Sequence, residues 1–197
     1  HSIINNRNHE FSIIQFMNSL QQKIILRINK EGPISFKTFM EMALYEPELG
    51  YYTSQNTKIG RAGDFYTSSH LHPIFGMMLG KQIEEMWEIM GKPSLFQIVE
   101  MGSGAGYLCK DMLDYYKGGK GPRGQGVEEE KNIFKYIQYI IIEFNPAMRE
   151  QQKKLLADYS DKIRWVSSLD ELNNIKGCIL SNELLDAFPV HLIEMED

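Results

Sequence analysis

Three glycines on alternate positions, Gly102, Gly104 and Gly106, follow the apolar run FQIVEM and its acid, Glu100. Glycines between a strand and a helix let the backbone take positive φ angles and approach a ligand closely. The first turn of the helix after such a loop directs its N–H groups at that ligand. The pattern therefore predicts a nucleotide-binding loop, with a glycine-rich turn that binds nothing as the alternative.

The spacing of these glycines selects between two kinds of nucleotide cofactor. Dinucleotide-binding enzymes use G-x-G-x-x-G to seat a pyrophosphate, whereas here the third glycine comes one residue earlier. The carboxylate of Glu100 would also be badly placed beside a diphosphate. S-adenosylmethionine fits better, because it carries a sulfonium, an ammonium and a ribose diol but no phosphate. We therefore predict that S-adenosylmethionine binds here and that Glu100 faces its amino-acid end, directly or through water.

A second acid, Glu143, closes the apolar run YIIIE. An acid at the end of the second strand of such a fold can accept hydrogen bonds from the ribose hydroxyls. Its separation from the glycine loop exceeds the roughly 20 residues usual for this arrangement. The glycine-rich, charged insertion between residues 117 and 132 accounts for the excess. We predict that Glu143 binds the ribose, with a solvated carboxylate at a strand end as the alternative.

Amide and acidic side chains follow a fourth apolar run in the stretch SNELLDAFP, which contains Asn182, Glu183 and Asp186. In an open α/β sheet the carboxyl edge of a strand faces the ligand crevice. The amide of Asn182 is suited to the methionine end of the cofactor or to the substrate. The stretch differs from the Asn-Pro-Pro-aromatic signature of enzymes that methylate base or amide nitrogens. The alternative is a polar loop with a helix N-cap at Asn182.

The stretch AGDFYTSS places Gly63 and Asp64 in a polar segment without a period of its own. A long loop in a compact domain is usually either functional or disordered. We interpret this one as ordered and predict that it belongs to the site. The alternative is an Asx-turn that closes a surface loop. His70 and His72 form an H-x-H pair, but no third ligand lies nearby, so packing beside Pro73 is expected and no metal is predicted.

Strand and helix patterns alternate along the second half of the chain, which predicts a mostly parallel sheet covered on both faces. The predicted strands are 96–101, 136–143, 162–166 and a run that begins at 177. The predicted helices lie within 10–32, 34–52, 72–91, 107–116 and 145–159. The second begins at the N-cap Ser35 and closes at the turn around Pro47 and Gly50, and the third ends before Gly91. The fold class is therefore α/β and Rossmann-like.

Composition limits the classes of partner. The 197 residues are 43% hydrophobic and 24% charged, as in a soluble globular protein, and their net charge is −5. An acidic chain argues against a nucleic-acid partner and is compatible with a basic protein substrate. No apolar run is long enough to span a bilayer. Cys109 and Cys178 fit no metal or redox spacing.

Several long segments resemble a known family. GPISFKTFMEMALYEPELGYY, GDFYTSSHLHPIFG, VEMGSGAGYL, IIIEFNPAMREQQ and SNELLDAFPVHLIEM occur in the same order in the MidA-like family of S-adenosylmethionine-dependent methyltransferases. That family includes a mitochondrial complex I assembly factor that methylates an arginine. The resemblance runs from Gly32 to the end, and Ser103 and Ala105 stand where many members have Pro and Arg.

The resemblance implies a seven-strand class I methyltransferase fold. Members continue well past residue 197, so the last strands and part of the substrate side are expected to be missing here. The expected organisation is an N-terminal helical extension with a cofactor-covering loop, 1–92, followed by an S-adenosylmethionine-binding Rossmann-like core, 93–197, incomplete at its C-terminus.

The resemblance also implies roles for individual residues. It places Asp64 near the sulfonium or the substrate cation, and carboxylates should hold a guanidinium through paired hydrogen bonds. The predicted catalytic residues are Asp64, Glu183 and Asp186. The predicted cofactor-binding residues are Gly63, Glu100, Gly102, Ser103, Gly104, Gly106, Glu143, Asn145, Ser168, Leu169 and Asn182.

The expected activity is methylation of an arginine on a protein such as a respiratory complex I subunit, with S-adenosylhomocysteine as the product. Two alternatives stay open: a non-catalytic assembly or scaffold protein that keeps the fold, and a small-molecule methyltransferase. The expected location is the bacterial cytoplasm, with the mitochondrial matrix as the alternative.

Overall fold

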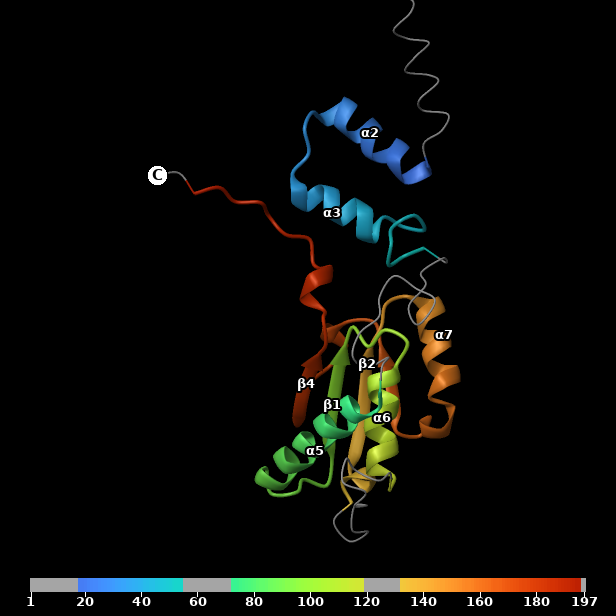
Figure 1. Cartoon of the computed structure of the whole chain (residues 1–197), viewed down its shortest axis with the longest axis vertical. Coiled ribbons are helices and arrows are strands. Elements are labelled where there is room, and N and C mark those ends of the chain that lie inside the picture. Colours follow the sequence, from blue (N-terminus) through green and yellow to red (C-terminus); the bar gives the residue numbers. More distant parts are fainter. Residues whose placement is uncertain (1–17, 55–71, 119–131, 196–197) are drawn as a thin grey trace, which may run out of the picture. The chain divides into compact units, whose positions relative to one another are not determined.

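The computed structural model describes residues 18–54, 72–118 and 132–195. The chain divides into two compact units, one formed by residues 1–57 and 185–197 and the other by residues 58–184. The larger unit carries the sheet, and Figure 1 labels its helices and three of its strands, β1, β2 and β4. Among the described residues, no helix combines the length and the hydropathy that a membrane crossing requires.

The larger unit is built on four parallel strands in the order β3-β2-β1-β4. Their bounds are β1 Phe96–Met101, β2 Ile137–Ile142, β3 Ile163–Val166 and β4 Gly177–Ser181. The two central strands are apolar and almost wholly buried, because both faces of a parallel sheet are covered by their crossover connections. The predicted parallel α/β sheet is confirmed.

In the part of the chain that the structure describes, the helices that pack with the sheet are α5 (Ile74–Ile89), α6 (Tyr107–Tyr116) and α7 (Pro146–Leu155). The main core joins α5 and α6 to one face of the sheet, and Figure 1 shows both helices on the same side. Its fully buried members include Phe96, Ile98, Met112, Tyr116 and Tyr139. A smaller core on the other face joins Val99, Ile140, Ile142 and Val166 to Leu172 and Ile175 of the β3–β4 connection.

Helix α5 approaches α6 closely because glycines face it. A Cβ added at Gly76 would lie 2.5 Å from Asp111 Cβ, and one at Gly80 would lie 3.1 Å from Tyr115 Cδ1. The hydroxyl of Tyr116 donates to the Gly80 carbonyl over 2.9 Å. Helix α5 therefore belongs with the sheet unit, while the predicted domain boundary at residues 92–93 stays a prediction.

The described residues of the smaller unit form two helices and a short turn. Helix α2 (Ser19–Glu31) begins at a capping box between Asn18 and Gln21, and α3 (Phe36–Tyr45) begins at Ser35, as predicted. The first part of the predicted helix 10–32 lies outside the described residues. The 3₁₀ turn η5 (Leu185–Ala187) is tied to α3, because the Tyr45 hydroxyl donates to the Ala187 carbonyl over 2.9 Å.

Candidate functional site

The carboxyl ends of the strands lie in register at one edge of the sheet. Met101 pairs with Ile142 on one side and with Ser181 on the other, and Ile142 pairs with Val166. The next residue of each chain segment is therefore at the same level: Gly102, Glu143, Ser167 and Asn182. This is the edge at which open α/β sheets bind their ligands.

The glycine loop has the backbone that its sequence predicts. Gly102, Gly104 and Gly106 have φ angles of 77°, 53° and 93°, which is the left-handed region where a Cβ is unfavourable. A Cβ at Gly102 would also lie 2.9 Å from Leu184 Cδ1. Gly106 is the N-cap of α6, and no side chain caps that helix terminus through a hydrogen bond. The loop thus brings backbone close to the sheet edge.

Glu100 is more enclosed than the sequence indicates. Its side chain is 1% exposed, and its Oε2 accepts a hydrogen bond of 2.7 Å from the Tyr139 hydroxyl. Burial raises the pKa of Glu100 to about 7, and the hydrogen bond from Tyr139 opposes that shift. The predicted contact with the amino-acid end of the cofactor stays a prediction, and the partner that the structure gives this carboxyl group is Tyr139.

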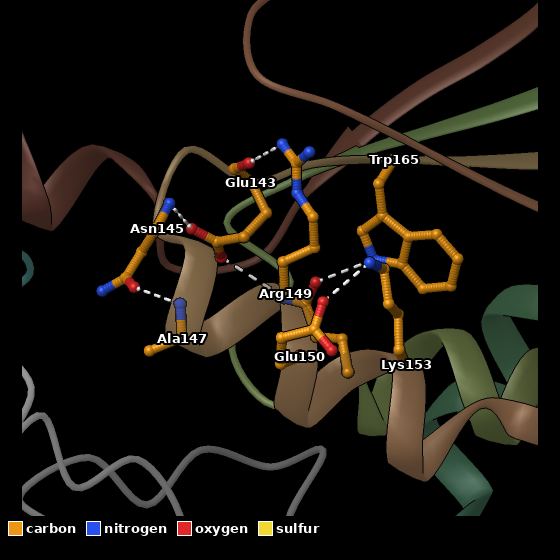
Figure 2. Close-up of polar contacts among 8 residues, drawn as sticks. Glu143, Asn145, Ala147, Arg149, Glu150, Lys153 and Trp165 are labelled. Carbon is orange, nitrogen blue, oxygen red and sulfur yellow. Dashed lines mark hydrogen bonds and ion pairs between the residues drawn. The ribbon is translucent and has the colours of Figure 1, made fainter.

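Glu143 is held at the end of β2 by contacts to both carboxylate oxygens (Figure 2). Oε1 accepts the backbone N–H of Asn145 over 2.8 Å, and Oε2 accepts the side-chain amide of Gln152 over 3.3 Å. The residue is 9% exposed. Burial raises the pKa of Glu143, while these hydrogen bonds and the nearby charge of Arg149 lower it. Each oxygen keeps further acceptor capacity for a hydroxyl group.

Asn145 and Arg149 fix the chain around Glu143. The Asn145 side chain caps α7, because its Oδ1 accepts the N–H groups of Ala147 and Met148 at 2.9 and 3.3 Å. One terminal nitrogen of Arg149 donates to the Glu143 carbonyl at 2.6 Å and to Ser167 Oγ at 3.1 Å. The amide oxygen of Asn145 is therefore committed to the helix, and its predicted contact with the cofactor stays a prediction.

Gln152 is a central residue that the sequence interpretation missed. Its amide nitrogen lies 2.7 Å from the Gly104 carbonyl and 3.2 Å from Ser103 Oγ, and its amide oxygen accepts the indole N–H of Trp165 over 3.0 Å. A signal was present in the sequence, because Met148, Gln152 and Leu156 recur every four residues. That spacing puts a polar side chain on the buried stripe of α7.

Ser168 and Leu169 follow β3 and begin a 3₁₀ turn, η4 (Leu169–Glu171). Ser168 is the N-cap of this turn and forms a capping box with Glu171. The side chain of Leu169 is 48% exposed. The hydroxyl of Ser168 is thus engaged in local structure, and cofactor binding by these two residues stays a prediction.

The predicted residues after β4 fall in two places. Asn182 and Glu183 lie directly after the strand in the sheet unit, with Glu183 exposed and in the left-handed region at φ 54°. Asp186 lies in η5 of the smaller unit and is exposed. No helix begins at Asn182, so the alternative of an N-cap there is wrong. Gly63 and Asp64 lie outside the described residues.

The chemistry of this edge suits a phosphate-free nucleoside cofactor. The glycine loop offers backbone at close range, and Glu143 offers carboxylate oxygens for a diol. Glu100 and Glu143 are both acids, and their ionised forms would repel a pyrophosphate. Among the described residues, no group of three or more His, Cys, Asp or Glu side chains is arranged to hold a metal ion. The residues present therefore fit S-adenosylmethionine better than a dinucleotide.

A parallel sheet with a glycine loop after β1 and an acid after β2 defines a Rossmann-like cofactor-binding protein of the methyltransferase class. The chain belongs to the family described as "Putative S-adenosyl-L-methionine-dependent methyltransferase", whose model matches residues 78–197. The resemblance to MidA-like methyltransferases is confirmed, and S-adenosylmethionine is the cofactor of this family.

Curated relatives carry a more specific name. "Protein arginine methyltransferase NDUFAF7, mitochondrial" of Danio rerio is 29% identical over 192 residues, which are 88% of this chain and 43% of the relative. The Drosophila melanogaster homologue is 29% identical over 199 residues, 91% of this chain and 43% of its own. The chain thus spans less than half the length of these relatives.

A solved structure supports the fold. A methyl transferase candidate from Burkholderia thailandensis, bound to S-adenosylhomocysteine, matches with a TM-score of 0.68 and 25% identity. The match covers 87% of this chain and 42% of that chain. That protein binds S-adenosylhomocysteine, the demethylated form of the cofactor.

Proposed function

We propose that the protein is an S-adenosylmethionine-dependent methyltransferase that modifies an arginine on a protein substrate. The observation that carries this proposal is the edge formed by the glycine loop and Glu143, in a family described as dependent on S-adenosylmethionine. The arginine acceptor is supported by the names of the curated relatives. A respiratory complex I subunit is the proposed substrate.

The residues at the sheet edge have distinct proposed tasks. When bound, S-adenosylmethionine supplies a methyl group already activated by its sulfonium, so the protein mainly aligns the acceptor and accepts one proton. Glu143 accepts hydrogen bonds from the ribose hydroxyls, and the glycine loop lets the backbone pack against the nucleoside. Glu100 and Asn182 are assigned to the methionine end.

The acceptor would be held by carboxylates. Glu183 follows β4 directly and is exposed, so it is able to meet a protein side chain that enters from solvent. A carboxylate can pair with the planar guanidinium through two hydrogen bonds and can concentrate its charge away from the attacking nitrogen. We assign this task to Glu183, and catalytic roles for Asp186 and Asp64 stay predictions.

We also propose a cellular location for the protein from the same comparisons. The named relatives are mitochondrial, which supports the mitochondrial matrix. The bacterial cytoplasm stays the other prediction.

The test is transfer of an isotopically labelled methyl group. The protein is incubated with methyl-labelled S-adenosylmethionine and a mitochondrial protein extract, and labelled peptides are identified by mass spectrometry. Label on arginine of one or a few proteins, lost in a Glu183→Gln variant, is the expected result. Label confined to small metabolites would favour a small-molecule methyltransferase, and binding of the cofactor without any transfer would favour a scaffold protein.

A further inference from the structure

One buried side chain connects three parts of the cofactor edge. Gln152 of α7 is 0% exposed, and its amide nitrogen lies within hydrogen-bond distance of Ser103, Gly104 and Glu143. Its amide oxygen accepts the indole N–H of Trp165 from β3. The glycine loop, the acid after β2 and the third strand therefore meet at a single amide group.

The amide of Gln152 is fully used. A primary amide has two N–H donors, and three acceptors lie at 2.7, 3.2 and 3.3 Å from its nitrogen. Loss of this group would leave buried acceptors without a donor. The free-energy penalty of such unsatisfied acceptors is larger than the net contribution of the hydrogen bonds to stability. The side chain has no spare donor for a ligand, so it acts through its neighbours.

The packing beside Gln152 leaves the glycine loop little freedom. A Cβ placed on Gly106 would lie 3.2 Å from Leu156 Cδ1 and 3.7 Å from Gln152 Cγ. The last glycine of the loop thus sits against the buried stripe of α7. A rotation of Gln152 would move the atoms on which the loop rests.

The hydrogen bond from Gln152 to Glu143 helps to fix the orientation of the Glu143 carboxylate. Gln152 holds Oε2 and the Asn145 N–H holds Oε1, so the plane of the carboxylate is fixed from two sides. Figure 2 shows the Glu143 carboxylate between the Asn145 backbone and α7, with Trp165 beside that helix. A carboxylate whose plane is already fixed loses less conformational entropy when it accepts hydrogen bonds from two hydroxyl groups of a ribose.

We propose that Gln152 is a positioning residue of the cofactor site, which orients the Glu143 carboxylate toward the ribose and ties the glycine loop to α7. This inference rests on the proposed cofactor site. The hydroxyl of Ser103 takes part, because its Oγ lies 3.2 Å from the amide nitrogen of Gln152.

The experiment measures binding of two probes by calorimetry. The probes are S-adenosylhomocysteine and its 2′,3′-dideoxyribose analogue, which lacks the groups that Glu143 is assigned to bind. The variant is Gln152→Met, which keeps the approximate volume and removes the amide. The matched control is Gln151→Met, the same substitution one residue earlier on the exposed face of α7.

We expect Gln152→Met to weaken S-adenosylhomocysteine about tenfold or more, because an oriented hydrogen bond to a charged group is lost. For the dideoxy analogue the same substitution should change the Kd only a few-fold, since the oriented carboxylate has no hydroxyl to meet. Gln151→Met should leave both constants unchanged. A side chain that merely stabilises the fold would weaken both probes by the same factor.

A second variant is tested in case Gln152→Met does not fold. Gln152→Glu is close to isosteric and keeps the oxygen for Trp165, but it replaces the amide donor by a carboxylate beside Glu143, so it should also bind S-adenosylhomocysteine far more weakly. Circular dichroism and the unfolding midpoint show which variants are folded. Equal losses for the two probes in a folded variant, or no loss, would overturn the positioning role. Failure of the unmodified protein to bind S-adenosylhomocysteine would instead overturn the proposed cofactor site.

Discussion

At the scale of single residues, the two acids at the sheet edge differ in their surroundings. Glu143 has hydrogen bonds to both carboxylate oxygens and an arginine nearby, which favour its ionised form. Glu100 lies deeper, and its carboxylate accepts a hydrogen bond from the Tyr139 hydroxyl. The first is suited to bind hydroxyl groups, and the second exchanges a proton near neutral pH.

Glu100 should therefore make the stability of the protein depend on pH. Its pKa rises from the ordinary 4.5 to about 7, so the folded chain binds more protons than the unfolded chain between these values. The free energy of unfolding should fall as the pH rises through this window, by roughly 3 kcal/mol in total. We expect Glu100→Gln, which stays neutral, to remove this loss. Urea unfolding at pH 5 and pH 8.5 measures it.

The exposed Glu85 offers the control, because Glu85→Gln also removes a carboxyl group but not a buried one. This control should keep the pH dependence of the unmodified protein. If Glu100→Gln keeps it as well, the group responsible is not Glu100.

The sequence predicted the acids but not their environment. Glu100, Glu143 and the three glycines stand out because their types and spacing are local features. Gln152 and Tyr139 belong to other elements. Gln152 lies 49 residues along the sequence from Ser103, to which it is hydrogen-bonded, and Tyr139 lies 39 residues from Glu100. Such pairings depend on strand order and helix packing, which the local pattern does not contain.

At the scale of secondary structure, α7 supports the site through its N-cap and its second turn. Asn145 caps its N-terminus, and Gln152 lies on its buried face. We expect Asn145→Ala to lower the free energy of unfolding by about 1 kcal/mol, because two N–H groups lose their acceptor. Asn145→Ser, which can still cap, should recover most of the loss in urea denaturation. Equal losses in the two variants would show that the cap is not what Asn145 contributes.

The contact between α5 and α6 gives a second prediction at this scale. Alanine in place of a helical glycine normally stabilises a helix by up to about 1 kcal/mol. At Gly76, however, the new Cβ would lie 2.5 Å from Asp111 Cβ, so Gly76→Ala should destabilise the protein by about 1–3 kcal/mol.

The comparison is Gly80→Ala, whose Cβ would lie 3.1 Å from a ring atom of Tyr115. A ring can shift by a few tenths of an ångström, so this variant should lose less stability, as measured by thermal or urea unfolding. Stabilisation by both substitutions would mean that the helices are farther apart than described.

The elements themselves were largely predictable. The apolar strand 96–101 and the helix 107–116 have the predicted bounds, because a short apolar run, a glycine turn and an apolar helical period follow one another without ambiguity. The turn after β4 was less clear. Glu183 takes a left-handed conformation, which its residue type does not indicate, and no helix begins at Asn182, which rules out the alternative of an N-cap there.

At the scale of the whole molecule, the glycine loop, Glu143 and Asn182 follow strands at one edge of one sheet. The strand order 3-2-1-4 brings the ends of β1 and β2 together at the centre, with β4 beside them. The net charge of −5 is compatible with a basic protein segment as substrate. The chain spans 43% of its curated relatives, so the substrate and the activity of the whole protein rest on the proposal made above.

The most direct test of the central claim is calorimetric titration of the chain with S-adenosylhomocysteine. We predict that the protein binds one equivalent and that Glu143→Ala abolishes binding. Glu150→Ala, which removes an exposed acid of α7 paired with Lys153, should bind like the unmodified protein. Binding that survives Glu143→Ala undiminished, or no binding by the folded unmodified chain, would contradict the assignment of this sheet edge as the cofactor site.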